Sequence, residues 1–346
     1  MLPPFVWSDD CLRHEPDAEI WVGVRTPATE VPARAVAIRE ALVAAGAREV
    51  AATTHDDSAL LAVHDPALVE FLRTAWDDWS AAALPSDRVV PYVFARSELT
   101  SGRAPAAPTA VWARPGLFAY DTMTLIGPGT WEAARAAVDV ALTAVDLVSA
   151  GEPVAYACCR PPGHHVTRSL YGGSCYLNNT AAAAAALLAS LGGPVAVVDI
   201  DAHHGNGTQE LFLHHRDVLT ASVHVDPGAG WFPHFLGFAA ENEAANLNLP
   251  LAPGTAEDGW LAAVREAATF AAPARALVVA LGVDAAAADP ESPLQVTAEG
   301  YREAGRLLGG LALPTVVVQE GGYDLTTIGG LVVAALEGLE QGRNAR

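Results

Sequence analysis

The chain has 346 residues, of which 51% are hydrophobic and 17% are charged, and its formal net charge is −20. This composition excludes a disordered or coiled-coil chain and provides enough apolar residues for a large α/β core. All of the positive charges are arginine, and the acidic balance argues against a nucleic-acid partner, which needs a basic surface. A negative field attracts small cations, although it serves solubility equally well.

Targeting and cysteine signals favour a cytoplasmic protein with no membrane partner. The N-terminus lacks the basic segment and apolar run of a signal peptide. The apolar run from Ala181 to Leu191 is too short to cross a bilayer. No C-x-x-C pair and no dense framework is formed by the cysteines, as expected in a reduced compartment. These are Cys11, Cys158, Cys159 and Cys175.

The chain begins with a short predicted strand over Pro4–Trp7, and a loop containing Glu19 follows. A helix is predicted over Pro32–Ala45, with proline in its first turn and glycine just past its end. A second helix is predicted over Pro66–Ala82, where apolar residues at helical spacing indicate a core stripe. That stripe comprises Leu68, Phe71, Leu72, Ala75, Trp76 and Trp79.

A proline-rich segment over about 84–128 interrupts the regular pattern. It shows little periodicity, and long loops of this kind are often binding loops or interface arms. Its last part carries apolar side chains that need a cover, and we expect the segment to form the arm of a homodimer and to shape the partner's entrance. Those side chains are Trp112, Leu117, Phe118 and Tyr120.

The rest of the chain alternates strands and helices, which predicts a single α/β domain with a mostly parallel sheet covered on both faces. Predicted strands span Val154–Cys159, Val195–Ile200, Val218–Val225, Ala276–Leu281 and Thr315–Gln319. Predicted helices span Thr130–Ser149, Asn179–Leu191, Ala256–Phe270, Ala298–Leu311 and Leu325–Leu339.

Polar residues follow four of these strands, and the carboxyl ends of parallel strands share one edge of a sheet. Asp201 and His203 are two residues apart, so in an extended segment they point to the same side and can bind zinc or a similar ion. A hydrogen-bonded strand end is the alternative explanation for this pair. The other strand ends carry a histidine pair, an aspartate and a tyrosine: His164, His165, Asp284 and Tyr323.

This set of residues suits metal-assisted hydrolysis of an amide. Asp201, His203 and Asp284 would leave one metal position open, as catalytic zinc sites do. A metal there would activate water and polarise a carbonyl, while one histidine moves the proton and Tyr323 donates to the developing oxyanion. No serine or cysteine nucleophile is required.

Six motifs in order identify a resemblance to the arginase–deacetylase superfamily, and within it to bacterial acetylpolyamine amidohydrolases and class II histone deacetylases. Weaker likeness extends to most of the chain, so the resemblance implies one deacetylase-like domain over 1–346. The motifs are RPPGHH (160–165), GGSCYLNN (172–179), DIDAHHGNGTQ (199–209), DPGAGWFPHFLGF (226–238), LGVD (281–284) and EGGY (320–323).

The resemblance assigns roles to these residues. His165 would be the general base and acid beside His164, Asp199 would orient His164, and Asn206 would contact His165. Tyr323 would be the oxyanion donor. One catalytic zinc would be held by Asp201, His203 and Asp284. A structural potassium ion would be held by Asp199, Asp201, His203, Ser222 and the carbonyl of Val223.

The substrate channel implied by the resemblance shows departures from the family pattern. Ser174 stands where relatives carry an aromatic residue, and Asp121 is the only acid between Leu99 and Pro128, where acetylpolyamine enzymes place carboxylates. The channel would be formed by Gly173, Ser174, Phe232 and Gly322. Six other histidines are expected to be structural or surface residues: His55, His64, His204, His214, His215 and His234.

The leading hypothesis is a zinc-dependent amidohydrolase that removes an acetyl or related acyl group from a small amine, with acetylpolyamines among the candidates. Deacetylation of acetyl-lysine in proteins, as by histone deacetylases, is the first alternative. A binuclear ureohydrolase would need an aspartate at Gly205 to bridge a second ion. A catalytically silent binding protein would have lost Tyr323 or a metal ligand, and all are present.

Overall fold

The computed structural model describes residues 1–345 and places one eight-stranded sheet at the centre of the chain. The strand order is β4-β1-β5-β10-β9-β6-β7-β8, and every neighbouring pair is parallel. This confirms the predicted single-domain α/β fold. The strands are β1 (Phe5–Trp7), β4 (Glu49–Ala51), β5 (Val154–Ala157), β6 (Val195–Asp199), β7 (Val218–Val225), β8 (Asn246–Leu251), β9 (Ala276–Leu281) and β10 (Thr315–Gln319).

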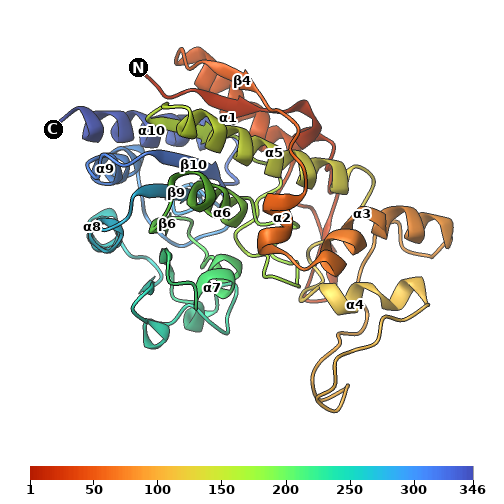
Figure 1. Ribbon diagram of the computed structural model, residues 1–346. Helices are drawn as coiled ribbons and strands as arrows, with labels where there is room; N and C mark the ends of the chain where they lie inside the picture. The colour runs from red at the N-terminus through yellow and green to blue at the C-terminus, as the bar shows by residue number, and fades with distance from the viewer. Residues whose placement is uncertain (346) are drawn as a thin grey trace.

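Helices cover both faces of this sheet (Figure 1). Successive strand residues point to opposite faces, so Val197 packs into one core and Val198 into the other. The first core is closed by α2 (Ser58–Val63), α3 (Pro66–Ala81), α5 (Thr130–Ser149) and α6 (Asn179–Leu191). The second is closed by α1 (Pro32–Ala44), α8 (Glu257–Ala271), α9 (Ala298–Gly309) and α10 (Ile328–Asn344).

Most predicted elements are present, with shifted ends. The predicted strand over Val154–Cys159 ends at Ala157, and α10 begins at Ile328 rather than Leu325 because Asp324 first accepts hydrogen bonds from Thr326 and Thr327. Both edge strands, β4 and β8, escaped the sequence analysis, as did the short helices α2, α4 (Pro115–Phe118) and α7 (Asn206–Phe212).

The segment around Glu19 was expected to be a loop, and this expectation is wrong. Residues Glu19–Trp21 form β2, which pairs antiparallel with β3 (Val24–Thr26). A two-stranded ribbon is marginal by itself, and these strands are too short and too exposed to show a clear alternation. Arg25 fastens the ribbon by bonding to both Asp17 and Asp87.

The proline-rich segment contains little regular structure and projects from the body between α3 and α4 (Figure 1). Its ends are joined by a bridge between Val89 and Ile126. Of the four apolar side chains expected to need a partner, only Trp112 is exposed. Phe118 instead stacks on Phe71 of α3, with ring centroids 4.6 Å apart. No helix within residues 1–345 is long and apolar enough to cross a membrane.

Candidate active site

Four adjacent strands at the centre of the sheet, β5, β10, β9 and β6, deliver the predicted site residues. Their registers bring the carboxyl ends level, because Gln319 is paired with Leu281 and Asp199 with Ala280. The histidine pair follows β5, Tyr323 follows β10, Asp284 follows β9, and Asp201 with His203 follows β6. The sheet therefore brings residues from four distant parts of the sequence to one edge.

Asp201, His203 and Asp284 form a cluster suited to a divalent metal. One ligand atom from each lies within 4.8 Å of the others. The Nδ1 atom of His203 is 3.0 Å from Asp284 Oδ2 and 3.3 Å from Asp201 Oδ1. Backbone N–H groups orient both carboxylates, with Gly321 donating to Asp201 and Ala202 to Asp284. Two carboxylates and an imidazole are a donor set that fits zinc.

The electrostatics of this cluster also favour a cation. Burial, followed by the charge of Asp201, raises the pKa of Asp284 to about 7. Burial opposes a positive charge on His203, but the hydrogen bonds that its imidazole donates to Asp201 and Asp284 outweigh burial and raise the pKa of His203 well above its usual value. A proton is therefore held where these three groups face one another, and a divalent ion would replace it.

The tandem histidines have different partners and different charges. His164 Nδ1 lies 2.9 Å from Asp199 Oδ2, and although burial opposes its charge, Asp199 and Asp201 raise the pKa of His164 to about 10. His165 Nδ1 lies 2.7 Å from Asn206 Oδ1. Burial, with the charges of His164 and His203, lowers the pKa of His165 well below its usual value.

The tautomer of His165 follows from its partner. The side-chain amide of Asn206 donates through Nδ2 to the backbone carbonyl of His165, which leaves Asn206 Oδ1 as the acceptor. His165 therefore carries its proton on Nδ1 and keeps a free lone pair on Nε2. A neutral imidazole with a free nitrogen, beside a cationic one, is arranged to accept a proton.

Tyr323 stands on a loop that is held from two sides. The guanidinium of Arg34 lies 4.5 Å from the centroid of the phenol ring and donates to the carbonyls of Gly322 and Glu320. Asp289 accepts from the backbone N–H of Tyr323 at 2.6 Å. Burial raises the pKa of the Tyr323 phenol well above its usual value, so the hydroxyl keeps its proton and can donate.

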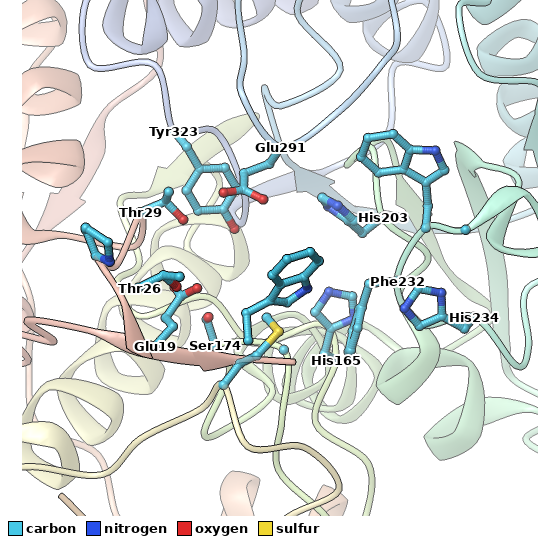
Figure 2. A pocket seen from close by; sticks show the side chains of 16 residues that line it. Glu19, Thr26, Thr29, His165, Ser174, His203, Phe232, His234, Glu291 and Tyr323 are labelled. Atoms are coloured by element: carbon cyan, nitrogen blue, oxygen red, sulfur yellow. The ribbon is translucent and has the colours of Figure 1, made fainter. Parts of the chain in front are cut away.

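A cavity of about 480 Å³ connects these groups to the surface, and His165, His203 and Tyr323 all face it (Figure 2). The backbone of Gly173, at φ +62°, packs closely against two side chains of the cavity wall. A Cβ atom there would lie 2.5 Å from His165 and 2.9 Å from Phe232. Of the four predicted channel residues, Gly173, Ser174 and Phe232 line the cavity. Gly322 does not, because it is buried within the tyrosine loop, where a Cβ atom would lie 2.5 Å from Val283.

The sequence analysis missed several residues that line this cavity. His234 is exposed at the surface, as expected, and it also lines the cavity beside Phe232 (Figure 2). Glu19 of β2 and Glu291 of the loop after β9 also line it. Burial, and then the charge of Glu291, raises the pKa of Glu19 to about 7. Glu19 and Glu291 lie outside the six motifs, and His234 lies within the motif DPGAGWFPHFLGF (226–238) but was assigned no role there.

Of the residues expected to hold potassium, Asp201 and His203 belong to the metal cluster, and Asp199 accepts the backbone N–H of Asp201 at 3.1 Å. Asp199 and Ser222 are register partners on β6 and β7 and line a small void of about 10 Å³. The Ser222 hydroxyl already contacts two imidazoles, at 3.3 Å from His204 Nδ1 and 2.8 Å from His224 Nδ1. The two histidines explain part of the polarity of this region without an ion.

A binuclear ureohydrolase site is not compatible with the local packing. Its bridging aspartate would replace Gly205, but a Cβ atom there would lie 2.2 Å from Asp199 Oδ2. The only cluster of metal-binding side chains among residues 1–345 is the one formed by Asp201, His203 and Asp284. The site is mononuclear in its donor set.

A buried Asp–His–Asp cluster, a neutral imidazole and a protonated phenol at the carboxyl edge of a parallel sheet define the class of metal-dependent hydrolases. The histone deacetylase domain model matches residues 28–339. The chain is 37% identical to acetylpolyamine amidohydrolase of Mycoplana ramosa over 344 residues, which covers 96% of this chain and 98% of the relative. It is 38% identical to acetylpolyamine amidohydrolase 1 of Pseudomonas aeruginosa over 343 residues, which covers 97% and 98%.

A solved structure agrees with these sequence comparisons. The crystal structure of acetylpolyamine aminohydrolase from Burkholderia pseudomallei superposes with a TM-score of 0.92 at 35% identity, covering 98% of this chain and 99% of that one. The chain belongs to the histone deacetylase family. It is an amidohydrolase of the metal-dependent deacetylase type.

Proposed function

We propose that this enzyme removes the acetyl group from acetylated amines that carry further positive charge, with acetylpolyamines as the substrate class. The observation that carries the proposal is the pair Glu19 and Glu291, which line the same cavity as His165, His203 and Tyr323. The names of the relatives and the net charge of −20 support the same class. The carboxylates come from β2 and the loop after β9, and not from the proline-rich segment.

In this proposal Asp201, His203 and Asp284 hold one zinc ion, which would supply an activated water and polarise the acetyl carbonyl. His165 takes a proton from the attacking water on its free Nε2 and returns it to the leaving amine. Asp199 holds His164 beside His165, and Asn206 keeps the proton of His165 on Nδ1. The Tyr323 hydroxyl donates to the carbonyl oxygen as negative charge develops there.

The roles proposed for Glu19 and Glu291 predict charge-selective binding that depends on pH. Replacing both with glutamine should raise KM for an acetylpolyamine about tenfold or more and leave KM for a neutral N-acetyl alkylamine of equal length unchanged.

Because the pKa of Glu19 is raised to about 7, its carboxyl group is neutral below that pH and anionic above it. KM for the charged substrate should therefore fall as pH rises through about 7, and Glu19→Gln should flatten this profile.

Glu70→Gln is the matched control for each single substitution, since it also removes one negative charge, on the exposed surface of α3. An equal rise in KM for charged and neutral substrates would contradict recognition by charge. An acetyl-lysine peptide belongs in the same comparison, because better turnover of the peptide than of every acetylpolyamine would favour the histone deacetylase-like alternative.

We also propose that the enzyme is a homodimer in which the proline-rich segment of one subunit shapes the entrance to the cavity of the other. Exposed apolar side chains on that segment include Tyr92, Leu99 and Trp112, which are 73%, 66% and 49% exposed. Beside the catalytic cavity lies a second one, bounded by Trp21 and Phe235, which are 60% and 85% exposed. Apolar surface of this kind marks a contact site.

Light scattering should give twice the chain mass at micromolar concentration. Leu99→Ser should shift the protein towards monomer, whereas Leu61→Ser on α2, another exposed leucine, should not. A wild-type protein that is monomeric throughout the micromolar range would exclude the dimer.

A structural potassium ion and a cytoplasmic setting complete the proposal. Asp199 and Ser222, which line one void, support a cation behind the metal cluster, with Asp201, His203 and the Val223 carbonyl as its further expected ligands. All four cysteines are free and buried, which supports a reducing compartment.

A further inference from the structure

Asp289 is a nearly buried carboxylate that none of the roles above uses. It lies five residues after Asp284 and is 7% exposed. Its oxygens accept three backbone N–H groups. Oδ2 accepts from Tyr323 at 2.6 Å and from Asp324 at 3.1 Å, and Oδ1 accepts from Glu291 at 3.0 Å. One side chain therefore joins the loop after β9 to the loop after β10.

The loop that carries Tyr323 has little rigidity of its own, because its glycines allow the backbone many conformations. Gly321 and Gly322 precede Tyr323, and Gly322 adopts φ +119°, a conformation that favours glycine. At Gly321 a Cβ atom would lie 2.5 Å from the carboxylates of both Asp201 and Asp284, so no larger residue can stiffen the loop there. The loop passes close to the metal cluster at the cost of intrinsic rigidity.

Arg34 and Asp289 hold the loop at neighbouring peptide groups. Arg34 binds the carbonyls of Gly322 and Glu320, on the side that precedes the tyrosine. Asp289 binds the N–H of Tyr323 itself. Asp289 also belongs to the loop that carries Asp284, so its contact sets the tyrosine relative to a metal ligand. Misplacement of a reacting group by about 1 Å can cost about 10²-fold in rate.

We propose that Asp289 is a positioning residue that places the hydroxyl of Tyr323 relative to the Asp284 loop. This inference rests on the proposed role of Tyr323 as the oxyanion donor. Through Glu291 the same carboxylate also fixes the backbone of a residue that lines the cavity. Asp289 acts on the reaction through Tyr323 and touches no reacting atom.

Substitutions at this position have distinct expected effects. Asp289→Ala removes all three contacts and should lower kcat about tenfold or more, with little change in KM for a neutral N-acetyl alkylamine. Asp289→Asn can turn its single oxygen towards Tyr323 and Asp324, so it should recover most of kcat. Asp324→Asn is the matched control, because that carboxylate binds Thr326 and Thr327 at the start of α10. Metal content and melting temperature are measured for every variant.

A double-mutant cycle with Tyr323→Phe tests whether Asp289 acts through the tyrosine hydroxyl. In the Phe background Asp289→Ala should lower kcat by no more than about twofold. An equal loss in both backgrounds, or no loss in the wild-type background, would overturn the proposal. If Tyr323→Phe alone keeps full activity, the role of Tyr323 is wrong, and the assignment of Asp289 falls with it.

Discussion

Asp201→Ala should abolish both metal binding and turnover. Wild-type protein dialysed against zinc should hold one zinc per chain by elemental analysis, and the variant should hold close to none. Asp201 is one of the three proposed protein ligands, and without it Asp284 and His203 would not complete a tetrahedral zinc site. Zinc should raise the melting temperature of the wild-type protein and leave that of the variant unchanged, because a ligand that binds only the folded state stabilises it.

Controls separate the loss of a ligand from the loss of structure. Asp201 also accepts the N–H of Gly321 at 2.7 Å, so some destabilisation is expected from the alanine variant. Asp65→Ala removes an aspartate that likewise accepts a backbone N–H, at the start of α3 and away from the cavity. It should cost about 1 kcal/mol of stability and keep its zinc. Two zinc ions per wild-type chain, or full activity of Asp201→Ala, would contradict the mononuclear site.

The centre of the fold could be predicted because local and tertiary signals agree there. The strands β5, β6, β9 and β10 are continuous apolar runs, as expected when both faces of a parallel sheet are covered. The edge strands β4 and β8 are partly exposed and carry mixed side chains, so their pattern was weak. They pair because the sheet offers them a free edge, which is a tertiary cause.

Some residues of the candidate site could likewise be predicted from the sequence, and others could not. The Asp–x–His pair, the tandem histidines and Tyr323 stand at the ends of strong strands, where topology alone brings them together. Glu19 and Glu291 could not be predicted as cavity residues. Tertiary contacts, such as the pairing of β2 with β3, place these segments at the cavity, and no motif around either residue indicates this. The role of Asp289 depends on hydrogen bonds to the backbone of another loop, and no side-chain pattern encodes them.

Tyr323→Phe should lower kcat by about 10²–10³, which is ~2.7–4 kcal/mol of transition-state stabilisation, while zinc content stays at one per chain. The phenylalanine ring keeps the stacking on Arg34, at 4.5 Å from the ring centroid, and the backbone N–H keeps its bond to Asp289. The variant therefore removes the hydroxyl and little else. Since the pKa of the Tyr323 phenol lies well above its usual value, the wild-type group is a neutral donor throughout the working pH range.

The separate effects of Tyr323→Phe on kcat and on KM show at which stage of the reaction the hydroxyl acts. Loss of a donor to charge that develops only in the transition state should lower kcat and kcat/KM by the same factor and leave KM unchanged. A rise in KM with kcat intact would instead mean that Tyr323 binds the ground-state carbonyl. Tyr120→Phe is the matched control, because that hydroxyl donates to the backbone carbonyl of His165, away from the reacting atoms. If both variants lose activity equally, the loss is not specific to the hydroxyl of Tyr323, and Tyr323 is not the oxyanion donor.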